Sequence, residues 1–201
     1  MRSIKSILIP ALLTLSLAGC SSVWGLSNDE FKDQLSEDIN TTAINEGFRL
    51  HKLLGGKSKR IIIVDFSLPS EENRFFVVDM DEQKIEHATL VSHAVNSGYR
   101  KAFHFSNTLG SKMSSVGRFV VGETYNGKNG LSVRIDGMDK GINDNARRRF
   151  IVIHGATYSE FEFFEKNGQL GRSEGCFAIP MTLHESIISK LTTGTPMYVY
   201  H

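Results

Sequence analysis

The chain has 201 residues and a formal net charge of +1, so its overall charge gives no reason to expect a nucleic-acid partner. Hydrophobic residues make up 40% and charged residues 22%, which is typical of one globular domain and excludes a disordered chain. The 18 glycines, set among β-branched and aromatic runs, favour a turn-rich β protein.

The first predicted element is a signal peptide over residues 1–19, which is not part of the fold. Arg2 and Lys5 precede an apolar stretch, residues 7–17, that is too short to span a membrane. The stretch runs into Leu-Ala-Gly-Cys at 17–20, which resembles the bacterial lipobox, where the peptide is cut before the cysteine and the new N-terminus is acylated. The alternative is an ordinary signal peptide that contains a cysteine by chance.

We therefore expect an exported lipoprotein that carries lipid on Cys20. Ser21 and Ser22 follow and no Asp stands beside the cysteine, a pattern that resembles sorting to the outer membrane in enterobacterial lipoproteins. The expected location is the outer membrane of a Gram-negative bacterium, facing the periplasm. Residues 20–40 are polar and mixed, which predicts a lipidated tether with one short helix capped by Ser27 and Glu30.

The folded domain is expected over residues 41–201. Apolar spacing predicts a helix over residues 41–54, and a β-branched run predicts a buried strand over 60–66. Residues 74–80 and 84–91 predict a hairpin. Further expected elements are strands at 115–121, 131–135 and 196–200, a turn over 124–129 and a helix from Pro180 to Leu191.

A long stretch rich in glycine and serine, residues 94–115, joins two of these strands. A loop of this length in a compact domain is usually functional, and Phe103 and Phe105 argue against disorder, so we expect it to line the substrate site. The arginines at 147–149 have two interpretations, a solvated face or a contact for an anionic glycan or lipid.

The candidate chemistry lies in two later segments. The apolar run 149–154 predicts a buried strand that ends at His154, and Cys176 is the only cysteine after Cys20. A thiol attacks as its thiolate and needs a nearby base, while Gly175 permits a tight turn with N–H groups free to face an oxyanion. The alternative is a buried structural cysteine and a histidine that merely ends a strand.

A zinc site is a second alternative, because zinc takes nitrogen and sulfur ligands. It would combine His93, His104, His154 and Cys176. No tight pair of ligands supports it, so we expect no metal and no cofactor.

These residues carry a family resemblance. His154-Gly155 followed by Ser173-Glu174-Gly175-Cys176 resembles the active-site motif of the L,D-transpeptidase (YkuD-type) catalytic domain, in its murein L,D-transpeptidase branch. The resemblance covers about residues 45 to 200. Its further matching stretches are 91–93, 105–107, 110–111, 114–117, 122–128, 143–146, 151–156 and 171–173.

The resemblance implies a mostly β fold, a sandwich or barrel-like pair of sheets with a few peripheral helices. It also implies a peptidoglycan substrate, the bond to D-Ala in a tetrapeptide stem. Cys176 would form a thioester, His154 would act as general base, and the N–H groups of Gly175 and Cys176 would hold the oxyanion. Ser173 would orient His154 or the turn. Substrate contacts are expected at Ser92, His93, Ser106, Asn107, Gly155 and Arg172.

The resemblance is compatible with three kinds of acceptor. A second stem's amine would form a cross-link, another amine would be attached to the wall, and water would make the protein an L,D-carboxypeptidase. The commoner pattern has His before Gly-Cys and Arg two residues after the cysteine, where this chain has Glu174 and Ala178. A non-enzymatic alternative is therefore a catalytically weak cell-wall-binding lipoprotein. Stem peptides and a membrane are the expected partners, without nucleic acid or a partner protein.

Overall fold

The computed structural model describes residues 25–201. The expected signal peptide, the lipobox and Cys20 lie outside these residues. Within the described part of the chain, no helix combines the length and the apolar character needed to cross a bilayer.

The described region is mostly β, as the sequence predicted. It contains eight strands, four α-helices and one short 3₁₀ turn. The strands are β1 (Arg60–Asp65), β2 (Phe75–Asp79), β3 (Lys84–Thr89), β4 (Gly117–Gly127), β5 (Gly130–Gly137), β6 (Val152–Ala156), β7 (Phe177–Pro180) and β8 (Pro196–Tyr200). The helical segments are α1 (Asn28–Leu35), α2 (Thr41–Leu53), η1 (Thr157–Ser159), α3 (Phe161–Asn167) and α4 (His184–Ile188).

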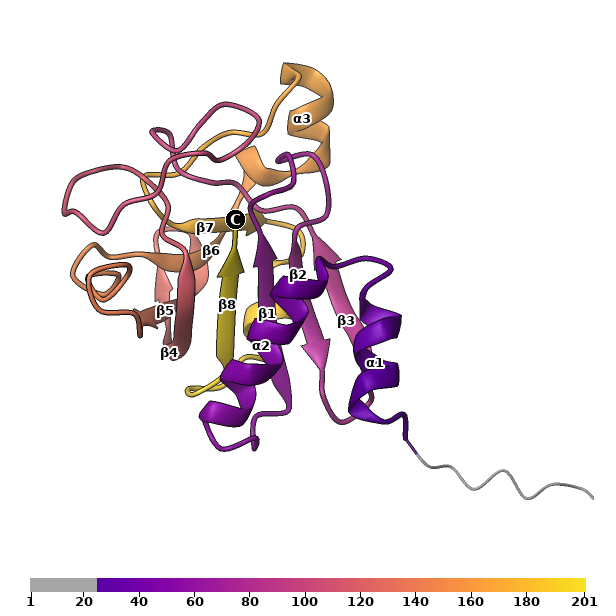
Figure 1. Cartoon of the computed structure of the whole chain (residues 1–201). Coiled ribbons are helices and arrows are strands. Elements are labelled where there is room, and N and C mark those ends of the chain that lie inside the picture. The colour runs from indigo at the N-terminus through magenta and orange to yellow at the C-terminus, as the bar shows by residue number, and fades with distance from the viewer. Residues whose placement is uncertain (1–24) are drawn as a thin grey trace, which may run out of the picture.

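All eight strands belong to one strongly curved sheet (Figure 1), in the order β3-β2-β1-β8-β4-β5-β6-β7. The pairs β1–β8 and β6–β7 are parallel, and the other neighbours are antiparallel. The edge strands of the sheet are β3 and β7. The segment after β3 reaches β7, where the Ser92 N–H donates to the Ala178 carbonyl at 2.8 Å. The fold is therefore a nearly closed barrel-like sheet, and not a sandwich of two sheets.

Alternation along the strands divides the apolar side chains between two clusters. In β1, Ile62 and Val64 face the inner cluster, whereas Ile61 and Ile63 face the outer one. Seven of the eight strands contribute to the inner cluster, which a flat sheet could not bring together. The helices α1 and α2 cover the outer cluster.

The folded region begins earlier than the boundary at residue 41 that the sequence predicted. In α1, Phe31 and Leu35 are 1% exposed and pack in the outer cluster, as does Ile39. The expected capping box is present, because Ser27 and Glu30 exchange hydrogen bonds. Residues 28–39 are therefore part of the domain and do not form a polar tether.

Several elements follow the sequence closely, and others do not. The expected strand 60–66, the hairpin, the helix 41–54 and the last strand are all present. The predicted turn over 124–129 is instead strand up to Gly127, with a two-residue turn at 128–129. Pro180 does not start a helix, because it ends β7 in parallel register with Ala156 of β6.

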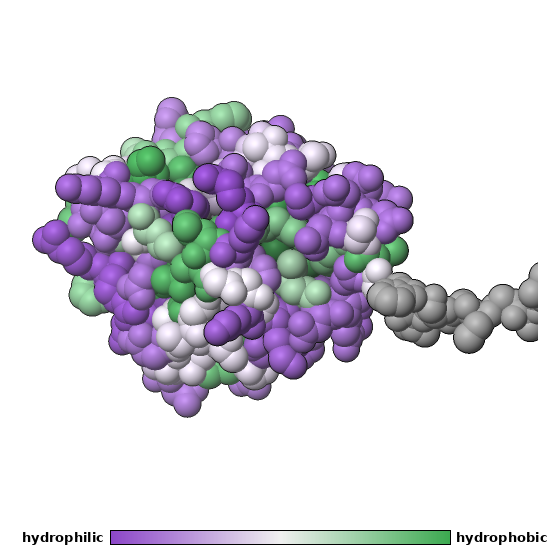
Figure 2. Space-filling view, turned by 60° about the horizontal axis from the view of Figure 1, so that its bottom comes forward, coloured by the Kyte–Doolittle hydropathy of each residue, from purple (hydrophilic) through white to green (hydrophobic). Residues whose placement is uncertain are grey.

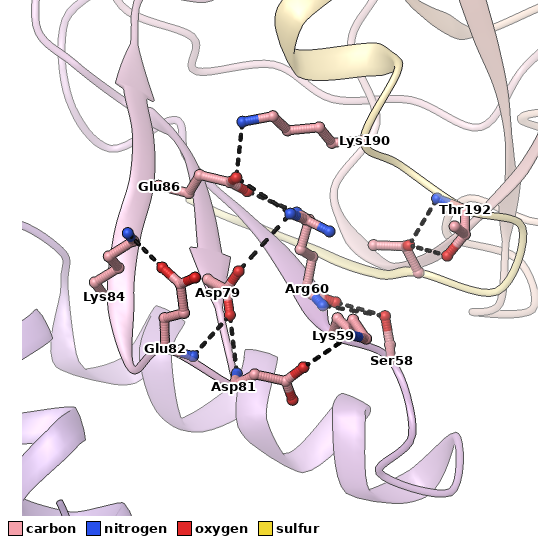
Figure 3. A network of polar contacts seen from close by, with 11 residues as sticks. Ser58, Lys59, Arg60, Asp79, Asp81, Glu82, Lys84, Glu86, Lys190 and Thr192 are labelled. Atoms are coloured by element: carbon pink, nitrogen blue, oxygen red, sulfur yellow. Dashed lines mark hydrogen bonds and ion pairs between the residues drawn. The ribbon is translucent and has the colours of Figure 1, made fainter. Parts of the chain in front are cut away.

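Charged residues gather at one end of β1, β2 and β3 (Figure 3). Glu86 of β3 accepts from Arg60 of β1 at 2.6 Å and from Lys190 at 2.8 Å. These bonds hold the pKa of Glu86 down to about 2, with Arg60 as the largest cause. The face shown in Figure 2 is mainly hydrophilic and carries small hydrophobic patches.

Candidate active site

A cleft of about 640 Å³ opens beside β6 and the turn that precedes β7. Both residues of the expected catalytic pair, His154 and Cys176, line it. The other lining residues are Gly110, Lys112, Tyr125, Gly127, Lys128, Asn129, Ser132, Arg149, Phe150, Val152, Tyr158, Ser173 and Glu174. The cleft therefore contains a thiol, an imidazole and several charged groups.

The strand register explains why His154 and Cys176 share this cleft. His154 of β6 lies directly opposite Ala178 of β7 in a parallel pair. Cys176 immediately precedes β7, and continuing the strand alternation by one residue places its side chain on the same side as Ala178. The thiol and the imidazole therefore open into the same cleft.

The hydrogen bonds of His154 determine which ring nitrogen carries the proton. Nδ1 lies 2.9 Å from the Gly155 carbonyl oxygen, which can only accept, so Nδ1 carries the proton. Nδ2 of Asn129, itself a donor, lies 3.2 Å from the same nitrogen, so the protonated Nδ1 donates through the shorter contact with the Gly155 oxygen. Burial lowers the pKa of His154, against the opposing effect of the Gly155 bond. The ring is therefore neutral near pH 7, with Nε2 unprotonated.

Cys176 is a free, half-buried thiol. Its Sγ donates to the Phe150 carbonyl over 3.6 Å. Burial raises the pKa of the thiol, while the Val152 N–H and the Arg149 charge lower it and Glu174 raises it. Burial is the largest of these causes. At rest, the thiol and the imidazole are both neutral.

A short turn, residues 173–176, presents the thiol. Gly175 has a φ of +140°, which a residue with a side chain adopts only with strain. The Ser173 hydroxyl donates to the Cys176 carbonyl at 2.7 Å and accepts from the Gly175 N–H at 3.2 Å. Of the two roles suggested for Ser173, the structure supports the one that fixes the turn. The Gly175 N–H is already engaged, so it is not the free oxyanion donor that the sequence predicted.

Phe150 has an unusual conformation next to the thiol. Its φ is +55°, in the left-handed region that a bulky residue rarely adopts. Its side chain is 75% exposed, and its carbonyl accepts the Cys176 thiol. The strained backbone thus directs this carbonyl towards the sulfur.

Two expected substrate-binding residues are buried away from the cleft. Ser92 is fully buried and bonds to the Ser159 hydroxyl at 2.8 Å. His93 is 1% exposed and lies 2.9 Å from the guanidinium of buried Arg74. Burial and that charge lower the pKa of His93 to about 4. The prediction that both residues contact substrate was wrong, because the hydrogen bond between Ser92 and Ala178 that closes the sheet buries Ser92 and His93.

Three further residues that were expected to contact substrate hold loops together and do not line the cleft. Asn107 bonds to Asp144 and Asn145, so it ties the long loop to residues 138–151. The Ser106 carbonyl accepts from Ser115 at 3.0 Å. Arg172 donates to the Gly98 carbonyl at 3.1 Å and stacks over the Tyr99 ring. Their polar groups are used in positioning loops.

Gly155 was also expected to contact substrate, but it is buried behind His154. A Cβ on Gly155 would lie 2.6 Å from Cγ of His184 and 2.9 Å from Sδ of Met181. The absence of a side chain therefore lets His184 pack against this strand, while the Gly155 carbonyl fixes the His154 tautomer.

The sequence analysis did not single out several charged or polar side chains that line the cleft. Lys112 comes from the long loop, Lys128 and Asn129 from the β4–β5 turn, and Arg149 from the segment before β6. The loop was expected to line the site, and its residues Gly110 and Lys112 do so. The Gly-Lys-Asn-Gly sequence at 127–130 was the available signal for the turn. No local signal identified Arg149, because its partners are more than 30 residues away in sequence.

The arginines at 147–149 do not form one solvated face. Arg147 pairs with Glu123 and Asp136, and Arg149 lies in the cleft, so only Arg148 is exposed. Lys112 pairs with Glu174 at 2.6 Å across the cleft. The balance of charge at the site is therefore positive.

Residues 25–201 contain no group of three or more His, Cys, Asp or Glu side chains that could hold a metal ion. His93 is buried against Arg74, and His104 is not among the cleft residues. The arrangement instead suits nucleophilic chemistry by a thiol with a neighbouring base.

Comparison with known proteins bears on the same region. A family model described as the L,D-transpeptidase catalytic domain matches residues 32–200. No curated protein matches the chain.

Several solved structures resemble the chain at low sequence identity. An L,D-transpeptidase from Mycobacterium smegmatis is 12% identical, with 71% of this chain and 59% of that chain covered and a TM-score of 0.44. L,D-transpeptidase 1 from Mycobacterium tuberculosis is 13% identical, with 71% and 62% covered and a TM-score of 0.40. L,D-transpeptidase 3 from the same organism, in complex with a faropenem-derived adduct, is 14% identical, with 71% and 60% covered and a TM-score of 0.40. The chain spans less than two thirds of the length of each.

Proposed function

The chain belongs to the L,D-transpeptidase catalytic domain family, and on this premise we propose that it is a cysteine-dependent acyltransferase that acts on tetrapeptide stems of peptidoglycan. The observation that carries the proposal is that His154 of β6 and Cys176, the last residue of the turn before the paired strand β7, line one cleft. The nucleophile is Cys176, the general base is His154, and the product of the first step is a thioester.

The first step begins from neutral partners. Because burial raises the thiol pKa and lowers the imidazole pKa, a free thiolate–imidazolium pair is not the resting form. His154 Nε2 takes the thiol proton as Sγ attacks the carbonyl of the residue before D-Ala. The tetrahedral oxyanion forms beside the turn, where the Cys176 N–H is the proposed donor.

Collapse of the tetrahedral species completes acylation. The C–N bond to D-Ala breaks, and His154 returns the proton to the departing amine, so the products are D-Ala and a Cys176 thioester. An acceptor amine then attacks the thioester, and its proton passes through His154 back to the sulfur. An amine from a second stem gives a cross-link, and water gives hydrolysis of the same bond.

The test uses a carbapenem, a strained acyl donor that this class of cysteine attacks. The purified protein is incubated with the drug, and its intact mass is compared with that of a Cys176→Ala variant. We expect one adduct on the wild type and none on the variant, with a strong loss of acylation rate in His154→Ala. A folded wild-type protein that forms no adduct would contradict the proposal and favour a wall-binding module.

Muropeptide assays then identify the acceptor. Release of D-Ala with a new cross-linked dimer supports transpeptidation, and release with only a tripeptide supports an L,D-carboxypeptidase. The same assay separates attachment of another amine, because neither product would then account for the D-Ala released.

We also propose that the protein is a lipoprotein of the outer membrane that faces the periplasm. The support is the sequence Leu-Ala-Gly-Cys at 17–20 and the serines that follow it. The test is the mass of the N-terminal peptide from cells together with membrane fractionation. Loss of membrane association in Cys20→Ala is the expected result.

A further inference from the structure

Arg149 has a set of partners that is unusual for a half-buried arginine. Its guanidinium donates to the Ser115 hydroxyl at 2.5 Å, the Met113 carbonyl at 2.5 Å and the Ser111 hydroxyl at 3.1 Å, and also to the Ser106 carbonyl. All four acceptors are uncharged. They belong to one segment, residues 106–115, which forms a wall of the cleft.

The neighbouring arginines differ in this respect. Arg147 is neutralised by Glu123 and Asp136, and Arg148 points to solvent with one bond to Asn145. Among residues 25–201, the ion pairs do not include Arg149. Its charge is therefore held in the cleft without a carboxylate partner, although burying an unpaired charge is costly.

The same guanidinium packs against the turn that carries the thiol. Nη2 of Arg149 lies 3.6 Å from the point where a Cβ on Gly175 would stand, and the Met113 carbonyl lies 3.5 Å from that point. Arg149 therefore sits between the long loop and the backbone of Gly175-Cys176. This contact with the turn is separate from the hydrogen bonds that Arg149 donates to the loop.

We propose that Arg149 is a positioning residue of the site, which clamps residues 106–115 against the Gly175-Cys176 turn and supplies a fixed positive charge to the Cys176 thiolate. The inference rests on the proposed function only in naming Cys176 as the nucleophile. The charge offsets part of the desolvation that disfavours the thiolate. The planar fork of donors suits a clamp, because one rigid group satisfies four acceptors.

Two substitutions separate the clamp from the charge. Arg149→Lys keeps a positive charge but cannot donate to four acceptors in a fixed geometry. Arg149→Gln keeps donors but removes the charge. Arg148→Gln is the matched control, because it removes the same charge from the adjacent, exposed position.

The experiment measures alkylation of Cys176 by iodoacetamide as a function of pH. The rate is followed on the tryptic peptide 173–190, so that Cys20 does not contribute. Because no peptidoglycan substrate or drug is used, the result is independent of whether the acyltransfer proposal holds. The other titratable or charged groups that line the cleft are Lys112, Tyr125, Lys128, His154, Tyr158 and Glu174, and all are unchanged in these variants.

We expect Arg149→Gln to slow alkylation at pH 7.5 by roughly threefold to tenfold and to move the rate–pH profile to higher pH, since tenfold corresponds to one pKa unit. Arg149→Lys should keep the wild-type profile while hydrogen exchange in residues 106–115 becomes faster. Arg148→Gln should change neither quantity.

Three results would overturn the inference. A folded Arg149→Gln protein with the wild-type profile would exclude the charge effect, and an equal shift in Arg148→Gln would assign it to bulk charge. Unchanged hydrogen exchange in Arg149→Lys would exclude the clamp. Where Arg149→Gln does not fold, Arg149→Lys decides the charge question, because a profile displaced to higher pH despite the retained charge contradicts the proposal.

Discussion

Ser173 offers the sharpest test of how the nucleophile is held. Its hydroxyl donates to the Cys176 carbonyl at 2.7 Å and accepts from the Gly175 N–H at 3.2 Å, and the residue is only 5% exposed. Ser173→Ala removes both bonds: losing the bond to the Cys176 carbonyl costs about 1 kcal/mol, and losing the acceptor leaves the buried Gly175 N–H unpaired, which costs about 1–3 kcal/mol. We expect the free energy of unfolding to fall by about 2–4 kcal/mol.

The measurement is urea unfolding at pH 7, with the carbapenem acylation rate as a second reading. Ser173→Thr keeps the hydroxyl and should recover most of both quantities. Ser36→Ala is the control, because its hydroxyl also bonds a carbonyl, Asp33 at 2.6 Å, but in an exposed position. A loss below about 0.5 kcal/mol in Ser173→Ala, equal to that of an exposed serine, would refute the argument from buried polar groups.

Three further predictions concern other parts of the molecule. Gly155→Ala should destabilise the protein by about 1–3 kcal/mol, because the new Cβ meets the His184 ring, and His184→Ala in the same chain should relieve part of that loss in urea unfolding. Glu86→Gln should make the free energy of unfolding depend less on pH in acid. Arg60 lowers the pKa of Glu86 to about 2, so the stabilisation that Glu86 provides is present above about pH 4.5 and is lost as the pH falls towards 2. Unfolding measured at pH 3 and pH 6 tests this, and an unchanged difference between the two pH values would contradict it. Glu174→Gln should lower the pKa of the Cys176 thiol, because Glu174 raises it, and iodoacetamide labelling that keeps its pH profile would show that the carboxylate is too screened to matter.

Sequence reasoning succeeded where local pattern determines structure. The β-branched run at 60–66 and the hairpin that follows are short-range features, and both are present. The cysteine and the histidine, which line one cleft, were singled out because each stands beside a glycine in a chain with one other cysteine. Those signals do not depend on how distant segments meet.

Sequence reasoning failed where contacts between distant segments decide the local structure. Ser92 and His93 follow the strand predicted over 84–91 and resemble site residues, but the hydrogen bond between Ser92 and Ala178 closes the barrel and buries them. Pro180 has the pattern of a helix start, yet parallel pairing with Ala156 keeps it in β7. The helix α3 was not predicted, because none of its residues is buried and its apolar pattern carries no signal for a core-facing side.

Closure of the sheet by contacts between distant segments also explains why the cleft contains charged groups that are not part of the sequence motif. The motif supplies a thiol and a base, but both are neutral at rest, because burial acts in opposite directions on their pKa values. Groups brought from elsewhere in the chain must therefore favour the charged form during attack. Arg149 reaches the turn from the segment before β6, and Lys128 from the β4–β5 turn, and both lower the pKa of Cys176. Activation of the proposed nucleophile thus depends on the closed barrel and its loops, and a mutation far from the motif can change it without touching Cys176 or His154.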